Sequence, residues 1–275
     1  MNALVETSEI AVRLPGKALI ESISLQIAPG SAVAMIGPNG AGKSTLLRVI
    51  SGDRAPSSGV VRLMGRAPAD YGPRELALRR AVLAQSVSVA FPFSVMEVVR
   101  MGAGERTGPA VEAMVEAALS EVDLLDMRDR IVNTLSGGEQ QRTHFARVMV
   151  QLGCGEARNG PGLLLLDEPT SSLDLRHQLD LLSSARRCVA RGVAVVAVMH
   201  DLNLAAMFAD RVLIMKSGRV VGDGPPSQTI TESNVSDVFG VTSAVGVLPP
   251  ASVPFSLPHS ARPSSPDKVV HTQRA

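Results

Sequence analysis

Gly37-Pro38-Asn39-Gly40-Ala41-Gly42-Lys43-Ser44-Thr45 is the stretch on which the fold of this 275-residue chain depends. It fits the pattern G-x-x-x-x-G-K-[ST], in which the backbone amides of a glycine-rich turn surround phosphate oxygens. The pattern requires a strand before it and a helix after it, and residues 32–36 and 45–50 are apolar runs suited to both. We therefore predict a phosphate-binding loop in an α/β fold, with Lys43 on the terminal phosphates and the Ser44 hydroxyl on Mg²⁺. A glycine-rich turn that binds nothing is the alternative left open by this stretch alone.

Composition and charge argue against several classes of protein. The chain has 27 basic and 26 acidic residues, a net charge of +1 and only 3% aromatic residues. Nucleic-acid surfaces need basic side chains and often stacking aromatics, so no nucleic-acid partner is expected. Cys154 and Cys188 lack metal-ligand spacing and are expected to be free thiols. Neither a secretory signal nor an apolar run long enough to cross a bilayer is recognisable, so any membrane association should be peripheral.

Polar side chains stand at the ends of several apolar runs. The runs 81–84, 163–166 and 193–199 are followed by Gln85, by Asp167-Glu168 and by His200. Ligands of open α/β sheets collect at the carboxyl ends of the strands, so these side chains are expected near the phosphate loop. Carboxylates that follow a buried strand are costly without a partner. An Mg²⁺ ion held by Asp167 and a water polarised by Glu168 as general base would supply both partners. Gln85 and His200 also have simple structural interpretations.

A second glycine-containing stretch begins a helix. Ser136 suits the N-cap position, and Glu139 stands where a capping box places its acidic partner. A structural role is therefore sufficient to explain this stretch. The consecutive Gly137 and Gly138 would also expose amide donors, which makes the same helix start a second possible anion site.

The periodicity of the remaining sequence predicts a divided α/β domain. The expected strands are 4–13, 19–28, 32–36, 60–64, 81–84, 163–166, 193–199, 211–215 and 219–222. The expected helices are 43–51, 73–78, 94–101, 109–119, a helical stretch over 123–129, 136–152, 175–190, 201–208 and 231–239, with a loop over 154–161. We predict a catalytic core over 1–85 and 156–243 that includes an antiparallel β subdomain, a helical subdomain over 86–155, and a proline-rich tail over 244–275 that is partly disordered.

In order, these motifs resemble an ATP-binding cassette over residues 4–240. The elements are the phosphate loop, Gln85, the stretch 135–141, Asp167-Glu168, Ser172-Leu173-Asp174 and His200. The resemblance implies a P-loop NTPase with a mixed, mainly parallel core sheet that binds ATP with Mg²⁺ and hydrolyses it. Residues 37–45 would bind the phosphates, with Lys43, Gln85, Glu168 and His200 catalytic and Ser44, Gln85 and Asp167 on the metal.

The resemblance also implies a head-to-tail homodimer that encloses two nucleotides. Ser136, Gly137 and Gly138 of one chain would complete the site that the phosphate loop of the other chain begins. Asp174 would lie in contacts across the interface. One position departs from the family, because Val12 stands at the offset where an aromatic side chain usually stacks on adenine, which leaves Val12 or Leu14 to make apolar contact.

Within the family the chain is most similar to ATPases of bacterial importers for iron chelates and vitamin B12, those for hemin above all. The residues concerned are 90–95, 97–102, 153–161, 174–178, 198–206 and 257–260. This implies two membrane permease subunits, a periplasmic binding protein as indirect partner, and a place on the cytoplasmic face of the bacterial inner membrane. A groove lined by residues 86–103 is the expected permease dock, with Phe91 and Phe93 either anchoring the permease or packing in the core.

Three alternatives remain open at this point. The transported substrate could be a siderophore or vitamin B12, because this kind of subunit does not select it. A cassette ATPase without a transport role, such as one for iron–sulfur assembly, would share the same motifs. A regulatory module that binds nucleotide without hydrolysis would share the loop, although the intact Asp167-Glu168 pair and His200 argue against it.

Overall fold

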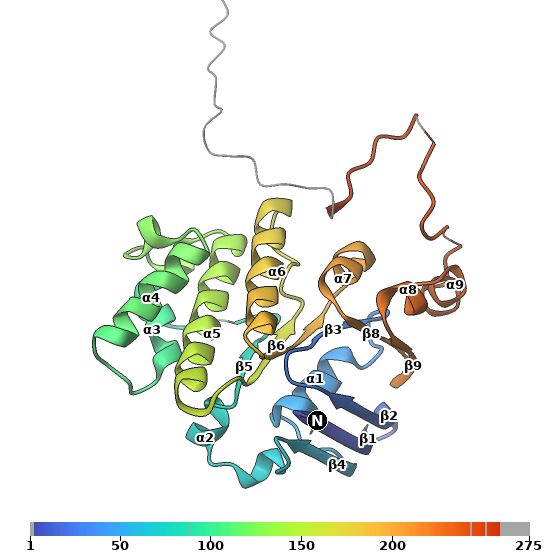
Figure 1. Cartoon of the computed structure of the whole chain (residues 1–275), viewed down its shortest axis with the longest axis horizontal. Coiled ribbons are helices and arrows are strands. Elements are labelled where there is room, and N and C mark those ends of the chain that lie inside the picture. The colour runs from blue at the N-terminus through green and yellow to red at the C-terminus, as the bar shows by residue number, and fades with distance from the viewer. Residues whose placement is uncertain (1–2, 88, 243, 251, 259–275) are drawn as a thin grey trace, which may run out of the picture.

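The computed structural model describes residues 3–87, 89–242, 244–250 and 252–258, and within them two β-sheets with helices between and around them (Figure 1). The smaller sheet has the order β2-β1-β4 and is antiparallel. Its strands are β1 (Val5–Leu14), β2 (Lys17–Ile27) and β4 (Ser58–Leu63). The larger sheet has the order β5-β6-β7-β3-β8-β9. Its strands are β3 (Ala32–Ile36), β5 (Arg80–Leu83), β6 (Leu163–Asp167), β7 (Ala194–Val198), β8 (Arg211–Lys216) and β9 (Arg219–Gly224).

The larger sheet is parallel from β5 to β8, and only β9 pairs antiparallel, as the hairpin partner of β8. Parallel strands covered on both faces are apolar along their whole length. Successive side chains point to opposite faces, so alternate residues enter different cores. Leu164 and Leu166 join the core beneath α5 and α6, whereas Leu163 and Leu165 join the core around α1. The predicted α/β fold with a mixed core sheet and an N-terminal antiparallel sheet is confirmed.

Helix α1 (Lys43–Ser51) lies between the two sheets. Its apolar side chains Leu46, Leu47, Val49 and Ile50 are almost fully buried. Burying each such side chain contributes roughly 1.5–3 kcal/mol, before the entropy of ordering it is subtracted. The helix is therefore clamped from both sides, which fixes its first turn and the loop that precedes it.

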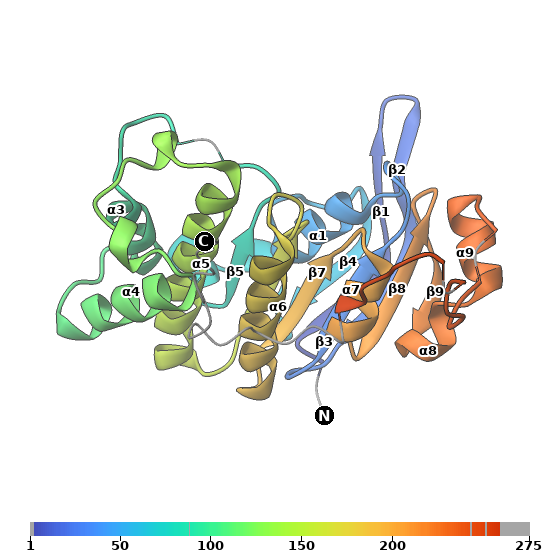
Figure 2. The same ribbon diagram turned by 90° about the horizontal axis from the view of Figure 1, so that it is seen from above.

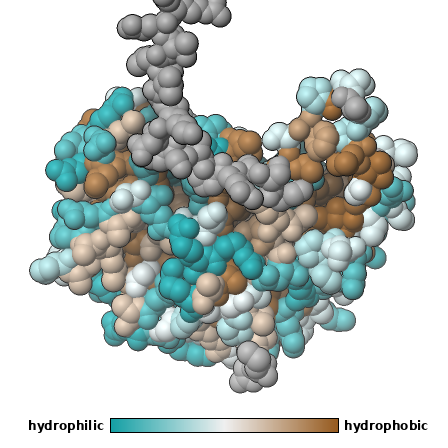
Figure 3. Space-filling view, turned by 45° about the horizontal axis from the view of Figure 1, so that its top comes forward, coloured by the Kyte–Doolittle hydropathy of each residue, from teal (hydrophilic) through white to brown (hydrophobic). Residues whose placement is uncertain are grey.

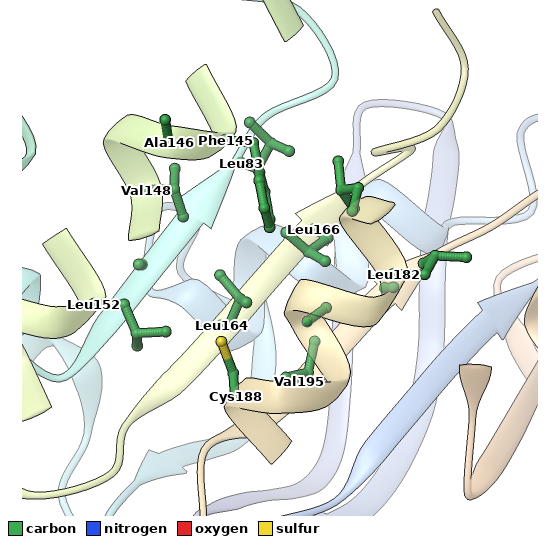
Figure 4. Close-up of a cluster of buried hydrophobic side chains, with 14 of the residues drawn as sticks. Leu83, Phe145, Ala146, Val148, Leu152, Leu164, Leu166, Leu182, Cys188 and Val195 are labelled. Atoms are coloured by element: carbon green, nitrogen blue, oxygen red, sulfur yellow. The ribbon is translucent and has the colours of Figure 1, made fainter. Parts of the chain in front are cut away.

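The helices α3 (Val95–Arg100), α4 (Pro109–Glu121) and α5 (Gly137–Asn159) form a group beyond the β5 edge of the larger sheet (Figure 2). Helix α5 contacts α3, α4 and β5, so it ties this group to the sheet. Figure 4 shows Phe145, Val148 and Leu152 of α5 packed with Leu83, Leu164 and Leu166 of the sheet and with Leu182 and Cys188 of α6 (Leu175–Ala190). Cys188 and Cys154 are both buried, and both are free thiols as predicted.

The remaining helices are short. They are α2 (Pro73–Ala77), which leads into β5, and α7 (Leu202–Phe208), α8 (Pro226–Thr229) and α9 (Glu232–Phe239) near the β8–β9 end of the sheet. Helix α8 was not predicted, since four residues after a proline carry too little periodicity to recognise.

Two predictions of secondary structure are wrong. Residues 154–161 do not form a loop, because α5 continues to Asn159. Gly155 serves packing, since a Cβ there would lie 2.4 Å from the carbonyl oxygen of Leu78, so only glycine permits this approach. Residues 123–129 contain only a 3-10 turn at Leu125–Met127, after Asp123 adopts a φ of 56°. The proposed boundary of the helical subdomain at residue 155 therefore falls inside a continuous helix.

The C-terminal segment after α9 exposes a series of apolar side chains. Val241, Val245, Val247 and Leu248 are all more than a third exposed. Figure 3 shows apolar side chains gathered on the upper right of the molecule, where this segment leaves α9. Most of the proline-rich tail, residues 259–275, lies outside the described residues, and the prediction that the tail is partly disordered stays a prediction there. Within the described part of the chain, no helix is both long enough and apolar enough to cross a membrane.

Candidate active site

The predicted phosphate loop joins β3 to α1. Gly37, Gly40 and Gly42 have φ values of 145°, 78° and 101°, a region that side-chain-bearing residues rarely adopt. Gly37 and Gly42 also have no room for a side chain. A Cβ on Gly37 would lie 2.1 Å from the Met215 carbonyl oxygen, and a Cβ on Gly42 would lie 2.7 Å from the Leu19 carbonyl oxygen. The loop is therefore held by its neighbours in a shape that glycine alone allows, directly before the positive end of a helix dipole.

Lys43 and Ser44 occupy the first turn of α1. The Lys43 ammonium donates hydrogen bonds to the carbonyl oxygens of Gly37 (2.7 Å) and Pro38 (3.0 Å), which folds the side chain back over the loop. The Ser44 hydroxyl donates to Asp167 Oδ1 at 3.0 Å, although the two residues are 123 positions apart in the sequence. The structure thus brings Ser44 and Asp167 together, as the sequence predicted.

The charges of this cluster are strongly affected by burial. Lys43 and Asp167 are each only 5% exposed. Burial lowers the pKa of Lys43, and the negative charges of Glu168 and Asp167 oppose that shift. Burial raises the pKa of Asp167; the Glu168 charge acts in the same direction, and the Ser44 hydrogen bond opposes it. A cation placed beside Asp167 would offset the cost of its buried charge.

Glu168 is held by the ends of the two neighbouring strands. Gln85, after β5, donates its amide nitrogen to Glu168 Oε2 at 2.7 Å. His200, after β7, places Nε2 2.7 Å from Glu168 Oε1, a contact that becomes an ion pair when the ring is protonated. The backbone of Glu168 adopts a φ of 51°, which is rare for a residue with a side chain.

A hollow of about 420 Å³ lies over these groups. It is lined by Asn39 to Thr45, Gln85, Glu168, His200 and two residues of β2, Lys17 and Leu19. Sequence reasoning missed Lys17 and Leu19, since their place beside Gly42 depends on how the two sheets pack. Val12 is only 1% exposed in the core of the smaller sheet, so it offers no face to a base. The expectation for Val12 does not agree with this geometry, whereas Leu14 is 44% exposed at the end of β1.

The second glycine stretch lies apart from this hollow. Ser136 caps α5 through the predicted capping box with Glu139, and Ser136 and Gly137 are exposed. Gly138 packs against the loop before α6, where its Cβ would lie 3.0 Å from the Ser172 carbonyl oxygen. None of Ser136, Gly137 or Gly138 lines the hollow. Within one chain the structure does not bring the two predicted anion sites together.

Asp174 begins α6. Its Oδ1 accepts hydrogen bonds from the backbone nitrogen of His177 at 3.0 Å and from the ring Nδ1 of His177 at 2.9 Å. Asp174 stands in the same loop as Ser172, and the Ser172 carbonyl oxygen is the part of that loop that lies against Gly138. It therefore groups with the second glycine stretch rather than with the phosphate loop.

A glycine loop before a helix, an acidic pair after a central strand and a histidine after the next strand define a P-loop nucleotide-hydrolase site. The model of the "ABC transporter" family matches residues 20–171. This chain belongs to the ABC transporter family, and ATP is its nucleotide.

Curated relatives align over nearly the whole chain. The "Hemin import ATP-binding protein HmuV" of Rhodopseudomonas palustris (strain BisA53) is 56% identical over 262 residues, covering 95% of this chain and 97% of that protein. The protein of the same name from Bradyrhizobium diazoefficiens is 52% identical with the same coverage. Among solved structures, the ADP conformation of MJ1267, "an ATP-binding cassette of an ABC transporter", has a TM-score of 0.74 at 20% identity, covering 87% of this chain and 99% of that one. This likeness supports the fold alone.

Proposed function

We propose that this chain is the ATP-hydrolysing subunit of a bacterial importer for hemin. The observation that carries the enzymatic part is Glu168, held by Gln85 and His200 beside the phosphate loop. The choice of hemin is supported by relatives that are named hemin import ATP-binding proteins. Their sequences are 56% and 52% identical to this chain and match it almost end to end.

The phosphate-binding residues act first in this mechanism. Backbone amides of residues 37–45, apart from Pro38, which has no N–H, and the Lys43 ammonium bind the β- and γ-phosphates of ATP, for which Lys43 exchanges its hydrogen bonds to Gly37 and Pro38. These donors are aimed at the oxygens on which charge develops in the transition state.

The oxygens beside the loop fit a magnesium ion. Ser44 Oγ and Asp167 Oδ1 already lie 3.0 Å apart, and Mg²⁺ prefers oxygen ligands of this kind. Gln85 donates its nitrogen to Glu168, which leaves its carbonyl oxygen as a third possible ligand. Among the described residues no group of three or more His, Cys, Asp or Glu side chains forms an alternative metal site. When bound, Mg²⁺ neutralises charge on the β- and γ-phosphates.

Glu168 is the general base in this proposal. Gln85 and His200 each occupy one of its carboxylate oxygens and leave lone pairs free to accept a proton from the attacking water. Its left-handed backbone is fixed by a hydrogen bond from its nitrogen to the Val198 carbonyl oxygen at 3.2 Å. The carboxylate is therefore oriented before substrate arrives, which is what general-base catalysis requires.

We further propose that two chains pair head to tail around two ATP molecules. The separation of Ser136–Gly138 from the hollow supports this, because a second copy could bring its own α5 N-terminus to the γ-phosphate. Each ATP would then touch both chains and hold them together, and hydrolysis would release them. Asp174, next to that stretch, would take part in the same interface.

For coupling, we propose that residues 86–103 of each chain receive a helix from one of two permease subunits at the cytoplasmic face of the inner membrane. Phe91 is 68% exposed and packs edge to face on Phe93, with the ring centroids 6.1 Å apart. Met101 is also exposed. Gln85 directly precedes this segment and donates a hydrogen bond to Glu168, so it links the site to the dock. The periplasmic binding protein would act through the permease.

The test of the dimer uses Ser136. Asp and Asn both cap helices as well as Ser does, but only Asp would place a negative charge against the γ-phosphate. We expect Ser136→Asp to lower turnover at least tenfold and Ser136→Asn to lower it much less, and wild-type specific activity to rise with protein concentration. Steady-state phosphate release over a concentration series measures both. A specific activity independent of concentration, with equal activity of the two variants, would reject the dimer.

Base recognition gives a second expectation. Leu19 and Lys17 are the side chains of β2 that a nucleotide in the loop would meet, and neither is aromatic. We expect KM values for ATP, GTP and UTP to agree within about tenfold, or ~1.4 kcal/mol, and Leu19→Tyr to lower all three by offering a stacking surface. Leu19→Met, which is matched in volume, is the control. A strong preference for ATP in the wild type would contradict this prediction.

A further inference from the structure

His177 stands in the first turn of α6 and bonds the residue that caps that helix. Its ring Nδ1 lies 2.9 Å from Asp174 Oδ1, and its backbone nitrogen lies 3.0 Å from the same oxygen. A carboxylate has no proton to give, so Nδ1 is the donor. An ordinary N-cap uses only the backbone bond. The ring adds a second bond that fixes the rotation of the Asp174 carboxylate.

The ring itself is held from the opposite side. Its Nε2 is buried and has no hydrogen-bond partner among the described residues. His177 lines a hollow of only about 20 Å³ where the end of α4 meets α5 and α6, together with Arg142, Phe145, Asp123 and Leu181 among others. Arg142 closes this junction by donating to the carbonyl oxygens of Val122 (2.6 Å) and Asp123 (3.0 Å). The ring is thus positioned by packing at a junction of three helices.

The loop that carries Asp174 is fixed from the same helix. Gln178 Nε2 donates to the carbonyl oxygens of Thr170 (3.1 Å) and Leu173 (2.9 Å). Gln178 therefore holds the backbone of the loop, and His177 holds its one carboxylate. The hydrogen bonds from His177 keep the pKa of Asp174 below its ordinary value, and the Arg142 charge acts in the same direction. Asp174 is accordingly ready to act as a charged acceptor at a set angle.

The geometry points to His177 as a positioning residue that orients Asp174 for contact with the second chain. This inference rests on the proposed dimer, in which the loop before α6 lies at the interface. His177 does not line the hollow over the phosphate loop, so it has no direct contact with ATP bound by its own chain. Its removal should therefore affect closure of the dimer and kcat, and leave KM for ATP nearly unchanged.

Three variants separate this role from a purely structural one. Asn at 177 places its amide N–H close to where Nδ1 lies, Gln places it near Nε2, and Ala removes it. We expect His177→Gln and His177→Ala to lower kcat about tenfold, the size of one hydrogen bond to a charged group, with KM within twofold. His177→Asn should retain at least half of wild-type kcat. Thermal unfolding of each variant reports on the fold, and the exposed Arg176→Ala is a neighbouring control.

The same substitutions in a Glu168→Gln background give a direct readout of closure. Light scattering with saturating ATP should show dimers for the Glu168→Gln parent and for the parent that also carries His177→Asn. It should show fewer dimers when the parent carries His177→Gln or His177→Ala. Equal dimerisation and equal kcat in all three variants would overturn the role of His177 while leaving the dimer intact. The role of His177 would also be overturned if kcat and dimerisation fell in step with the unfolding temperature and fell in His177→Asn as much as in the other two variants. A parent that stays monomeric would reject the dimer and this inference together.

Discussion

Glu168→Gln is expected to lower ATP turnover by about 10²–10⁴-fold, the contribution usual for a positioned general base. Glutamine keeps the length and shape of the side chain but accepts a proton far less readily. The two partners of Glu168 can adapt to it, since the Gln85 amide can turn and a ring nitrogen of His200 can donate or accept according to its tautomer. The fold should therefore survive, and the loss should lie in kcat.

The same variant is expected to bind ATP and to stop at the closed dimer. Phosphate binding depends on Lys43 and the loop, which the substitution leaves in place. Phosphate release measures turnover, and gel filtration with ATP and Mg²⁺ measures dimer. Glu75→Gln is the matched control, because Glu75 is half exposed in a surface pair with Arg66 that should contribute little. Turnover within threefold of wild type would remove Glu168 from the role of base.

Local patterns were sufficient to predict most of this site. Gly37 to Thr45 specify a turn, a helix start and an anion site within nine residues, and the apolar runs before Gln85, Glu168 and His200 give the strand ends. Parallel strands bring such ends to one edge, so their proximity follows from topology before any coordinates exist. The fold class and the family followed from the same few stretches.

What the sequence did not reveal depends on contacts between distant segments. The entry of Lys17 and Leu19 into the hollow follows from the packing of the β1–β2 hairpin on α1, and no local signal marks it. The run Gly153-Cys154-Gly155 reads as a loop, yet the structure uses Gly155 for a close helix–backbone approach to Leu78. The burial of Val12 follows from the register of β1, which has several irregularities. A one-residue change in register would turn that side chain outward.

Lys43 tests the other half of the site. Lys43→Met keeps the apolar stem, which is almost fully buried, and removes the charge that burial already makes costly. We expect a loss of about 10²–10³-fold in turnover, or ~2.7–4 kcal/mol, as for other donors aimed at developing charge. Unlike Glu168→Gln, it should also weaken ATP binding, because Lys43 contacts the phosphates before reaction.

The double variant Lys43→Met/Glu168→Gln separates the two roles. Glu168→Gln alone should form ATP-dependent dimers, and adding Lys43→Met should abolish them, since the nucleotide that joins the chains is no longer held. Titration with a fluorescent ATP analogue, with unfolding temperature as the control for folding, measures the binding step. If Lys43→Met bound ATP as tightly as wild type, the ammonium would serve only to hold Gly37 and Pro38 in place, and phosphate binding would depend on the backbone amides of the loop.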